Sequence, residues 1–560
     1  MGIGTLYTYT PLPNATYSEA VEQSTSPAQE WQRYLDARQK VDDELAQLAR
    51  LARLDNPLIA EIFLVHQEIL HDRLLTDGVR AAIDRGTSAA TATQQTTSEL
   101  VLVFQNLSDN YFASRAVDIR DVGQRLLAHL SDISLARQLA ALPPNTILLA
   151  EDLTPFDATH LSPESVTGIA LAGSAPTAHT AILARSLGIP LICSVGAAIL
   201  QLPSGLSGVV DGLQGRLVVE PDPDLLGNYT QTRQRLLAFR ITAESHSHED
   251  AVTLDGQQVW VHANVNSQED MLQIASSGAD GIGLLRTEYL FQERTKPPTV
   301  EEQLEAYRLI RSQTTGEILT VRLLDIGGDK PVRYLPQMTE SNPFLGVRGI
   351  RLLLQHPELL RDQLQALVSL AQDENISGVV RILVPMVSKI EEVYRVLAML
   401  DEIPGYREEH QPGGRLQLGL MIEVPAAALL ADRLAPLVDF FSIGTNDLAQ
   451  YTMAADRVNS AVASLTSPLD PAVLRLIGMT CQAGRLAGIP VSICGEMASD
   501  PSIFPLLFGL GVTEVSVVAP AVALVKEAVR QTDGDAARRL AERALQASRA
   551  QDVHRLLHPE

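Results

Sequence analysis

Cysteine, positive charge and long apolar runs are all scarce in this chain of 560 residues. Its three cysteines, Cys193, Cys481 and Cys494, lack the spacing of a metal ligand set and cannot form a disulfide framework, which fits a reducing cytoplasm. No run approaches the roughly 20 apolar residues that span a bilayer, and no signal peptide is evident. A net charge of −23 argues against binding to nucleic acid. We expect a cytoplasmic protein of several domains, without membrane insertion or a nucleic-acid partner.

The first 250 residues change their hydrophobic pattern several times. Apolar residues recur at helical spacing between two segments of β-rich sequence. We expect residues 1–20 and 143–221 to form one α/β domain, residues 21–142 to be an all-helical insertion in it, and residues 222–250 to be a linker helix. The β-rich runs of the α/β domain are Ile147–Ala150, Gly168–Ala172, Pro190–Cys193 and Arg216–Val219.

From residue 251 to 560 short apolar runs alternate with helical patterns. Eight β and α units over about 300 residues predict a (β/α)₈ barrel. The eight runs are Val259–Val265, Gly281–Leu285, Leu319–Asp325, Arg381–Val387, Leu418–Val424, Phe440–Gly444, Val491–Cys494 and Glu514–Val518. Polar residues fall at or near the C-terminal ends of these runs, where barrel enzymes keep their active sites. They are Arg286, Asp325, Glu423, Asn446, Asp447 and Cys494.

His179 lies where a small-residue loop enters an apolar-periodic helix that Gly188 and Pro190 terminate. A helix start offers free backbone N–H groups and a positive dipole to an anion. A neutral imidazole there could accept a phosphoryl group, and an ordinary pKa of about 6.5 keeps most of it neutral in the cytoplasm. The alternative is a histidine satisfied by a local carbonyl. A covalent phosphohistidine is the first hypothesis for this chain.

The predicted barrel rim supplies charges that suit a small anionic substrate. Arginine side chains can bind a phosphate or carboxylate with two hydrogen bonds, although any one of them could be a surface residue. Glu423 and Asp447 suit Mg²⁺, which takes one or two protein carboxylates, or they only balance the arginines. Cys494 is a core residue or a proton donor that stays protonated at neutral pH. The candidate arginines are Arg286, Arg322, Arg348 and Arg457.

The chain resembles enzyme I of the phosphoenolpyruvate-dependent sugar phosphotransferase system along nearly its whole length. The most specific segment is Asp439–Arg457, which contains Gly-Thr-Asn-Asp-Leu-Ala-Gln-Tyr. Three shorter segments add to the resemblance: Gly283–Phe291, Asp325–Lys330 and Asn342–Gly346, the last of which leads into Arg348. The sequence departs from the family pattern at Ser174-Ala175, where the family carries two glycines.

The resemblance implies a reaction and a role for each candidate. Phosphoenolpyruvate would bind the barrel with Mg²⁺ and donate its phosphoryl group to His179. The α/β domain would then swivel to the carrier protein HPr, docked on the helical unit. Glu423 and Asp447 would hold the metal, and Cys494 would protonate the enolate of pyruvate. The substrate would be held by Arg286, Arg322, Arg348, Asn446 and Arg457. The family also implies a homodimer formed through the barrel.

Three alternatives stand against this interpretation, and the first two stay open. One is an enzyme I-like component of a dedicated or fused system, for fructose or dihydroxyacetone. Another is a non-catalytic regulatory homologue, which would be expected to have lost candidate chemical residues, and none is lost here. The third is the pyruvate phosphate dikinase and phosphoenolpyruvate synthase class. That class needs an ATP domain, and no unassigned segment is large enough to form one.

Overall fold

The structure is a computed structural model that describes residues 1–9, 26–55, 57–105, 110–130, 139, 142–153, 157, 161–173, 188–267, 270–292, 294–314, 316–327, 332, 334–335, 340–411, 413–457, 459 and 462–558. His179, Ser174 and Ala175 lie outside the described residues. The chain forms two units, Met1–Leu237 and Ala238–Glu560. Each unit is described by itself below.

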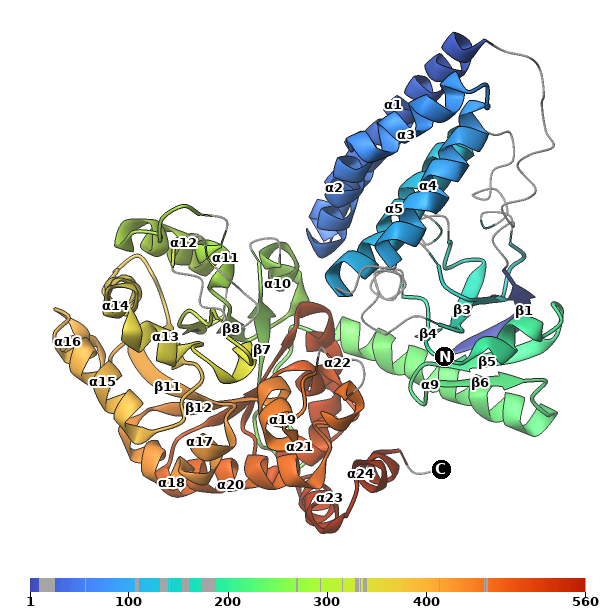
Figure 1. Cartoon of the computed structure of the whole chain (residues 1–560). Helices are drawn as coiled ribbons and strands as arrows, with labels where there is room; N and C mark the ends of the chain where they lie inside the picture. The colour runs from blue at the N-terminus through green and yellow to red at the C-terminus, as the bar shows by residue number, and fades with distance from the viewer. Residues whose placement is uncertain are drawn as a thin grey trace. The chain divides into compact units, whose positions relative to one another are not determined.

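The first unit begins with a strand and continues into a group of helices. The helices are α1 (Pro27–Asp55), α2 (Pro57–His71), α3 (Arg73–Asp84), α4 (Ala89–Gln105) and α5 (Asn110–Leu130). Helix α1 packs along α2, and α4 packs along α5 (Figure 1). Helix α3 starts where the Asp72 side chain accepts a hydrogen bond from the backbone N–H of Leu74, which satisfies one of the free donors of the first turn. An apolar core that includes Tyr34, Val41 and Val122 lies between these helices.

This unit also contains a six-stranded sheet among the described residues. The strands are β1 (Gly2–Thr8), β2 (Thr146–Ala150), β3 (Val166–Leu171), β4 (Leu191–Ile192), β5 (Ser207–Asp211) and β6 (Arg216–Val219), and the order is β4-β3-β2-β1-β5-β6. Strand β1 pairs in parallel with β2, so the helices are inserted between two neighbouring strands. Two apolar clusters pack on the sheet, one around Leu148 and Ile169 and the other around Leu149 and Val210.

The sequence did not predict β5, which pairs antiparallel with both β1 and β6. Its segment Ser-Gly-Val-Val-Asp contains only two strongly apolar residues, too few for a period to stand out. After β4 the chain forms a 3₁₀ helix, Ala197–Gln201, before it enters β5. Helix α9 (Pro223–Ser245) crosses the boundary between the two units, within the linker helix expected over residues 222–250.

The second unit is a closed barrel of eight parallel strands within the described residues, which confirms the predicted fold. The strands are β7 (Trp260–Val265), β8 (Gly281–Leu285), β9 (Ile318–Arg322), β10 (Val379–Val384), β11 (Leu416–Ile422), β12 (Phe440–Gly444), β13 (Val491–Cys494) and β14 (Glu514–Val518). Each of the eight predicted runs overlaps one of them. All residues of β8 and β12 are buried, as expected for strands with side chains packed on both faces.

Helices surround the barrel (Figure 1). The α-helices are α10 (Met271–Ser277), α11 (Glu288–Phe291), α12 (Val300–Ser312), α13 (Ile350–Gln355), α14 (Pro357–Ala371), α15 (Ile390–Asp401), α16 (Tyr406–Glu409), α17 (Pro425–Leu429), α18 (Ala431–Leu434), α19 (Thr445–Met453), α20 (Pro471–Ala487), α21 (Phe504–Leu510), α22 (Val522–Arg530), α23 (Gly534–Gln546) and α24 (Ala550–Leu557). Short 3₁₀ helices span Pro343–Leu345, Ala435–Leu437, Ala463–Leu465, Glu496–Ser499 and Ala519–Ala521. One apolar cluster runs through strands and helices. In the described part of the chain, no helix combines the length and apolarity needed to cross a bilayer.

Candidate active site

The C-terminal ends of the barrel strands bring the predicted site residues together. Arg322 and Cys494 are the last residues of β9 and β13, and Arg286 and Glu423 directly follow β8 and β11. Because all eight strands are parallel, these ends meet at one rim. A cavity of about 50 Å³ lies there, and all eight predicted barrel residues line it. These are Arg286, Arg322, Arg348, Glu423, Asn446, Asp447, Arg457 and Cys494.

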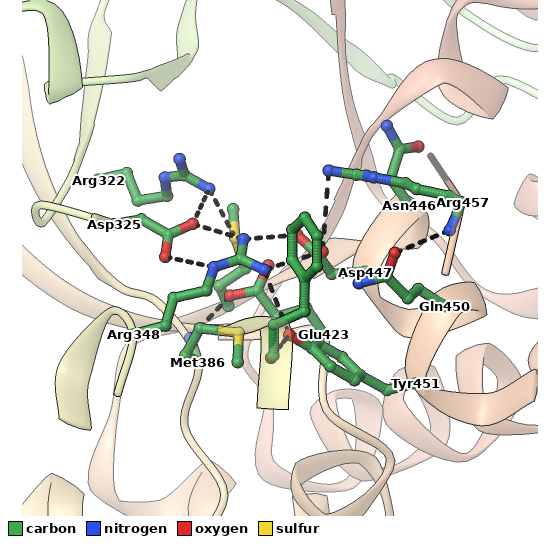
Figure 2. Close-up of polar contacts among 12 residues, drawn as sticks. Arg322, Asp325, Arg348, Met386, Glu423, Asn446, Asp447, Gln450, Tyr451 and Arg457 are labelled. Atoms are coloured by element: carbon green, nitrogen blue, oxygen red, sulfur yellow. Dashed lines mark hydrogen bonds and ion pairs between the residues drawn. The ribbon is translucent and has the colours of Figure 1, made fainter. Parts of the chain in front are cut away.

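Arg348 joins two carboxylates that come from different parts of the barrel (Figure 2). Its Nε and Nη2 donate to the two oxygens of Asp325, each at 2.9 Å. Its Nη1 and Nη2 donate to the oxygens of Asp447 at 3.2 and 3.0 Å. Burial alone would lower the pKa of Arg348, but the two carboxylates raise it above its ordinary value. The guanidinium is therefore a permanent cation that holds Asp325 beside Asp447.

Arg322 is buried and makes a second set of ion pairs. Its Nη2 lies 2.6 Å from Glu288 Oε1, and its Nη1 lies 3.1 Å from Asp325 Oδ2. Glu288 Oε1 also accepts a hydrogen bond from the backbone N–H of Asp325 at 3.2 Å. Asp325 thus lies between Arg322 and Arg348, and its position is set by both.

Two guanidinium nitrogens at the cavity have no hydrogen-bond partner among the described residues. They are the Nε atoms of Arg286 and Arg322, both shielded from solvent. Burial, followed by the positive charge of Arg322, lowers the pKa of Arg286 from its ordinary value. A buried donor without an acceptor costs about 1–3 kcal/mol, and more for a charged group. The site is therefore short of negative charge beside Arg286, which an anionic ligand would supply.

Glu423 is buried at the same rim, and its Oε1 accepts a hydrogen bond from the backbone N–H of Met386 at 2.7 Å. Met386 has a φ of 59°, a conformation that is uncommon for residues other than glycine. A Cβ added at Gly444 would come within 2.9 Å of Glu423 Oε2, so this carboxylate needs the space that the glycine leaves. Burial and then the negative charges of Asp447 and Asp325 raise the pKa of Glu423 to about 8.

Such a group of carboxylates favours a bound proton or a cation, which is the environment that a divalent metal stabilises. The donor set is small, however. In the described residues, no three His, Cys, Asp or Glu side chains are grouped closely enough to hold a metal ion by themselves. A magnesium ion at Glu423 and Asp447 would depend on substrate oxygens and water for its other ligands, as is usual for this ion.

Cys494 is buried at the cavity wall. Its Sγ lies 3.5 Å from the carbonyl oxygen of Ile443, to which it donates, and 3.6 Å from the Oγ of Ser442. Burial raises the pKa of the Cys494 thiol, so the thiol carries its proton at neutral pH. The next residue, Gly495, has a φ of 107°, and a Cβ there would lie 2.3 Å from Thr445 Oγ1. A glycine is needed for β13 to end beside α19.

Asn446 and Arg457 border the site near α19. The Asn446 side chain contacts Glu496, whose backbone N–H donates to Asn446 Oδ1 at 3.2 Å. Arg457 Nη2 lies 3.9 Å from Asp447 Oδ1, and its backbone N–H donates to Gln450 Oε1 at 3.1 Å. Figure 2 shows Arg348 and Arg457 approaching Asp447 from different directions.

Models of three related families match successive parts of the chain. "PEP-utilising enzyme, N-terminal" matches residues 1–115, "PEP-utilising enzyme, mobile domain" matches residues 142–215, and "PEP-utilising enzyme, PEP-binding domain" matches residues 241–534. A phosphoenolpyruvate-protein phosphotransferase of Haloferax volcanii is 41% identical over 528 residues, which are 94% of this chain and 91% of that one.

The chain belongs to the phosphoenolpyruvate-protein phosphotransferase (enzyme I) family.

Two more relatives of this enzyme I family member show the range of the family. The phosphoenolpyruvate-protein phosphotransferase of a Bacillus species is 38% identical over 497 residues, 88% of this chain and 85% of that one. A "multiphosphoryl transfer protein" of Rhodobacter capsulatus is 40% identical over 504 residues, which are 90% of this chain but 60% of that one.

Sequence reasoning missed three side chains of this enzyme I site. Glu288 stands only two residues after Arg286, and its signal was its place directly behind a strand end. Tyr451 accepts a hydrogen bond from Arg348 Nη1 at 3.2 Å and donates to the carbonyl of Phe344 at 2.6 Å, although 103 and 107 residues separate it from these partners. Gln363 lies on α14, far from any strand end in the sequence, and no local signal could have found it.

Proposed function

We propose that this enzyme I family member transfers the phosphoryl group of phosphoenolpyruvate to its own His179 and then to a histidine of an HPr-like carrier protein, releasing pyruvate. The match to a PEP-binding domain over the barrel supports the first substrate. The match to a mobile domain over residues 142–215, a range that contains His179, supports the site of the intermediate. Phosphoryl transfer needs mainly positioning and charge neutralisation, and the rim offers both.

One observation carries this proposal: every predicted barrel residue lines a single cavity, and two shielded arginine nitrogens there have no hydrogen-bond partner among the described residues. Phosphoenolpyruvate carries a phosphate and a carboxylate, and both are anions that guanidinium groups bind with paired hydrogen bonds. The Nε atoms of Arg286 and Arg322, which have no acceptor among the described residues, would gain one from the substrate. Arg348, Arg457 and Asn446 would complete the binding of substrate from the other side of the cavity.

The buried carboxylates suit Mg²⁺, which Glu423 and Asp447 would hold together with substrate oxygens. When bound, the metal neutralises charge on the transferring phosphoryl group. Arg348 has a separate task, because it keeps Asp447 in place through two hydrogen bonds. Met386 does the same for Glu423 through its backbone N–H.

The proposed chemistry assigns one proton transfer to Cys494. An imidazole nitrogen of His179 forms a bond to phosphorus, the bond between phosphorus and the enol oxygen breaks, and that oxygen keeps the electron pair as the enolate of pyruvate. The enolate carbon then takes a proton from the Cys494 thiol, and solvent returns a proton to the thiolate. A raised thiol pKa keeps the proton on Cys494 until the enolate has formed.

The carrier, the quaternary structure and the location belong to the same proposal. The family implies an HPr-like partner on the helical unit, a homodimer through the barrel and a cytoplasmic enzyme. One alternative has its own support. The Rhodobacter capsulatus relative is named a multiphosphoryl transfer protein and is much longer than the part matched here. That match favours a fused or dedicated system as the second candidate.

Incubation with radiolabelled phosphoenolpyruvate and Mg²⁺ tests the first half-reaction. We expect an acid-labile, base-stable label on the protein that His179→Ala abolishes. His356→Ala is the control, because the side chain of this partly exposed histidine pairs with Glu358 at 3.5 Å and lies outside the cavity. Full labelling of the His179→Ala protein would overturn the proposal. Transfer of the label to purified carrier proteins then distinguishes a general carrier from one of a dedicated system.

The role of Cys494 has a test of its own. We expect Cys494→Ala to form pyruvate 10²- to 10⁴-fold more slowly, the range (about 3–5 kcal/mol) that a positioned proton donor contributes. Phosphate exchange between phosphoenolpyruvate and His179 should continue. Cys481→Ala is the matched control, since Cys481 is equally buried but on α20 outside the cavity. Unchanged pyruvate formation by Cys494→Ala would remove this role.

A further inference from the structure

Gln363 is a fully buried amide on α14, behind the barrel wall rather than in it. Its Oε1 accepts a hydrogen bond from the backbone N–H of Leu324 at 2.9 Å. Its Nε2 donates to Thr287 Oγ1 at 3.2 Å and to the hydroxyl of Tyr307 at 3.3 Å. A single side chain therefore contacts two segments that follow neighbouring strands, because Thr287 lies after β8 and Leu324 lies after β9.

Strands β8 and β9 lose their regular pairing just before these contacts. Gly281 and Ile282 pair in register with Ile318 and Leu319, after which the register shifts and Leu285 pairs with Val321. Beyond that point backbone groups need other partners. The carbonyl of Arg322 accepts from Thr287 Oγ1 at 2.9 Å, and the N–H of Leu324 donates to Gln363. Hydrogen bonds from side chains thus replace the backbone hydrogen bonds between β8 and β9 where the two strands separate.

Only one assignment of donors and acceptors is consistent with the hydrogen bonds around Gln363. Thr287 gives its hydroxyl proton to Arg322, so toward Gln363 it can only accept. Tyr307 gives its proton to Gln303 Oε1, so it too can only accept from Gln363. Position 363 therefore needs two donors and one acceptor in a planar group, and this is the inventory of a primary amide. A leucine, which has neither, or a carboxylate, which only accepts, would break the network.

Two residues next to these contacts, Arg286 and Asp325, line the cavity of the proposed site. Thr287 lies between Arg286 and Glu288, and Leu324 precedes Asp325. Glu288 in turn holds Arg322 at 2.6 Å. A shift of either segment would change the separation of Arg286 and Arg322, the two arginines whose Nε atoms have no partner among the described residues.

We propose that Gln363, through Thr287 and Leu324, is a positioning residue that sets the separation of Arg286 and Arg322 for phosphoenolpyruvate, an inference that rests on the function proposed above. Gln363 touches no substrate. Its effect is geometric, and a displacement of about 1 Å at a phosphoryl-transfer site can cost about 10²-fold in rate.

The test measures single-turnover labelling of His179 over a range of phosphoenolpyruvate concentrations, with wild type, Gln363→Leu, Thr287→Val and Thr287→Ser. We expect Gln363→Leu and Thr287→Val to lower the rate at saturating phosphoenolpyruvate tenfold or more, with a smaller change in the half-saturating concentration. Thr287→Ser keeps the hydroxyl and should restore at least half of the wild-type rate. Thermal unfolding of each variant identifies a temperature at which all are folded.

Gln365→Leu is the matched control, because Gln365 lies on the same helix, is only partly buried and contacts Ser369 at 3.3 Å. It should label at the wild-type rate. If Gln363→Leu does not fold, the comparison of Thr287→Val with Thr287→Ser decides the inference by itself. The inference is overturned if Thr287→Val labels within twofold of wild type, or if Thr287→Ser is as slow as Thr287→Val. A wild-type protein that does not label His179 at all would instead refute the proposed function.

Discussion

Arg381 of β10 and Arg348 near the rim are both buried arginines that pair with carboxylates, at opposite ends of one barrel. Toward the N-terminal end, Arg381 donates to both oxygens of Glu514 at 2.7 and 3.2 Å and to Gln417 at 2.8 Å. Its guanidinium also lies 4.8 Å from the ring centre of Phe440. This arginine is fully engaged, and its carboxylate partner Glu514 also lies 3.8 Å from His262 Nε2.

The two ends push the pKa of a buried glutamate in opposite directions. Burial would raise the pKa of Glu514, but His262 and Arg381 lower it to about 2. At the rim, burial and two neighbouring carboxylates raise the pKa of Glu423 to about 8. The rim also leaves Arg286 without a hydrogen-bond partner for its Nε among the described residues. At the N-terminal end, the buried carboxylate is paired with cations of the protein. At the rim, the buried charges are balanced only when a ligand adds charge.

This difference separates a structural ion pair from the proposed binding site within the same fold. A buried ion pair contributes to stability only as long as both partners are present, because removal of one leaves a buried charge. An unbalanced site reduces the stability of the free protein and recovers it on binding. Mutations at the two ends should therefore have opposite signatures in stability and activity.

Arg381→Met should have the largest effect on stability. Loss of the cation leaves Glu514 buried without its partner, which costs about 3–5 kcal/mol. Chemical denaturation measures this, and labelling of the folded variant should stay near wild type. Arg407→Ala is the control: Arg407 and its partner Asp401 are exposed, so their ion pair is worth less than about 1 kcal/mol. A loss below 1 kcal/mol for Arg381→Met would contradict the structural role of this end.

Arg286→Ala should have the reverse effect of Arg381→Met, with a loss of activity rather than of stability. We expect a 10²- to 10³-fold lower rate of His179 labelling, or about 2.7–4 kcal/mol, because a charged donor at the transferring group is lost. Stability should not fall, since Arg286 Nε has no protein partner to lose among the described residues and its removal relieves a buried unpaired donor. Arg294→Ala, which breaks a partly exposed pair with Glu302, is the control. Activity within threefold of wild type would remove Arg286 from the site.

Acid should reduce the contribution of Glu514, at the N-terminal end of the barrel, to the free energy of unfolding within a defined pH range. The pKa of Glu514 is about 2 in the folded protein and about 4.5 in the unfolded chain, so its contribution is complete above pH 4.5 and is lost as the pH falls toward 2. The shift corresponds to ~3 kcal/mol. Denaturation of wild type and Glu514→Gln from pH 6 to 3 should show their difference shrinking. A constant difference across this range would show that Glu514 does not titrate as the ion pair requires.

Mg²⁺ should stabilise the rim and leave the other end unaffected. At 100 times its dissociation constant, the ion should add about 2.7 kcal/mol to wild type and to Glu514→Gln but nothing to Glu423→Gln. Without Mg²⁺ at pH 8, Glu423→Gln should be at least as stable as wild type, because the raised pKa of Glu423 means that its ionised form disfavours the fold. Thermal unfolding with and without the ion checks this. An equal Mg²⁺ shift in Glu423→Gln would place the metal elsewhere.

Much of the fold could be predicted from local patterns. All eight barrel strands were located from runs such as Gly281–Leu285 and Phe440–Gly444, whose bounds the structure reproduces. Strand β5 was missed, because its role depends on β1, from which it is separated by about 200 residues. The convergence of Arg286, Glu423 and Cys494 could also be predicted, since parallel strands end on one side of a barrel.

The sequence by itself determined which charged residues stand at strand ends, because that follows from the spacing of apolar runs. Only the tertiary structure decided how those charges combine. Arg348 and Asp447 are 99 residues apart and Arg381 and Glu514 are 133 apart, yet each pair is buried and in hydrogen-bond contact. The energy of a charge depends on its partners and on how much water it retains, and both are set by chain segments that no local pattern connects.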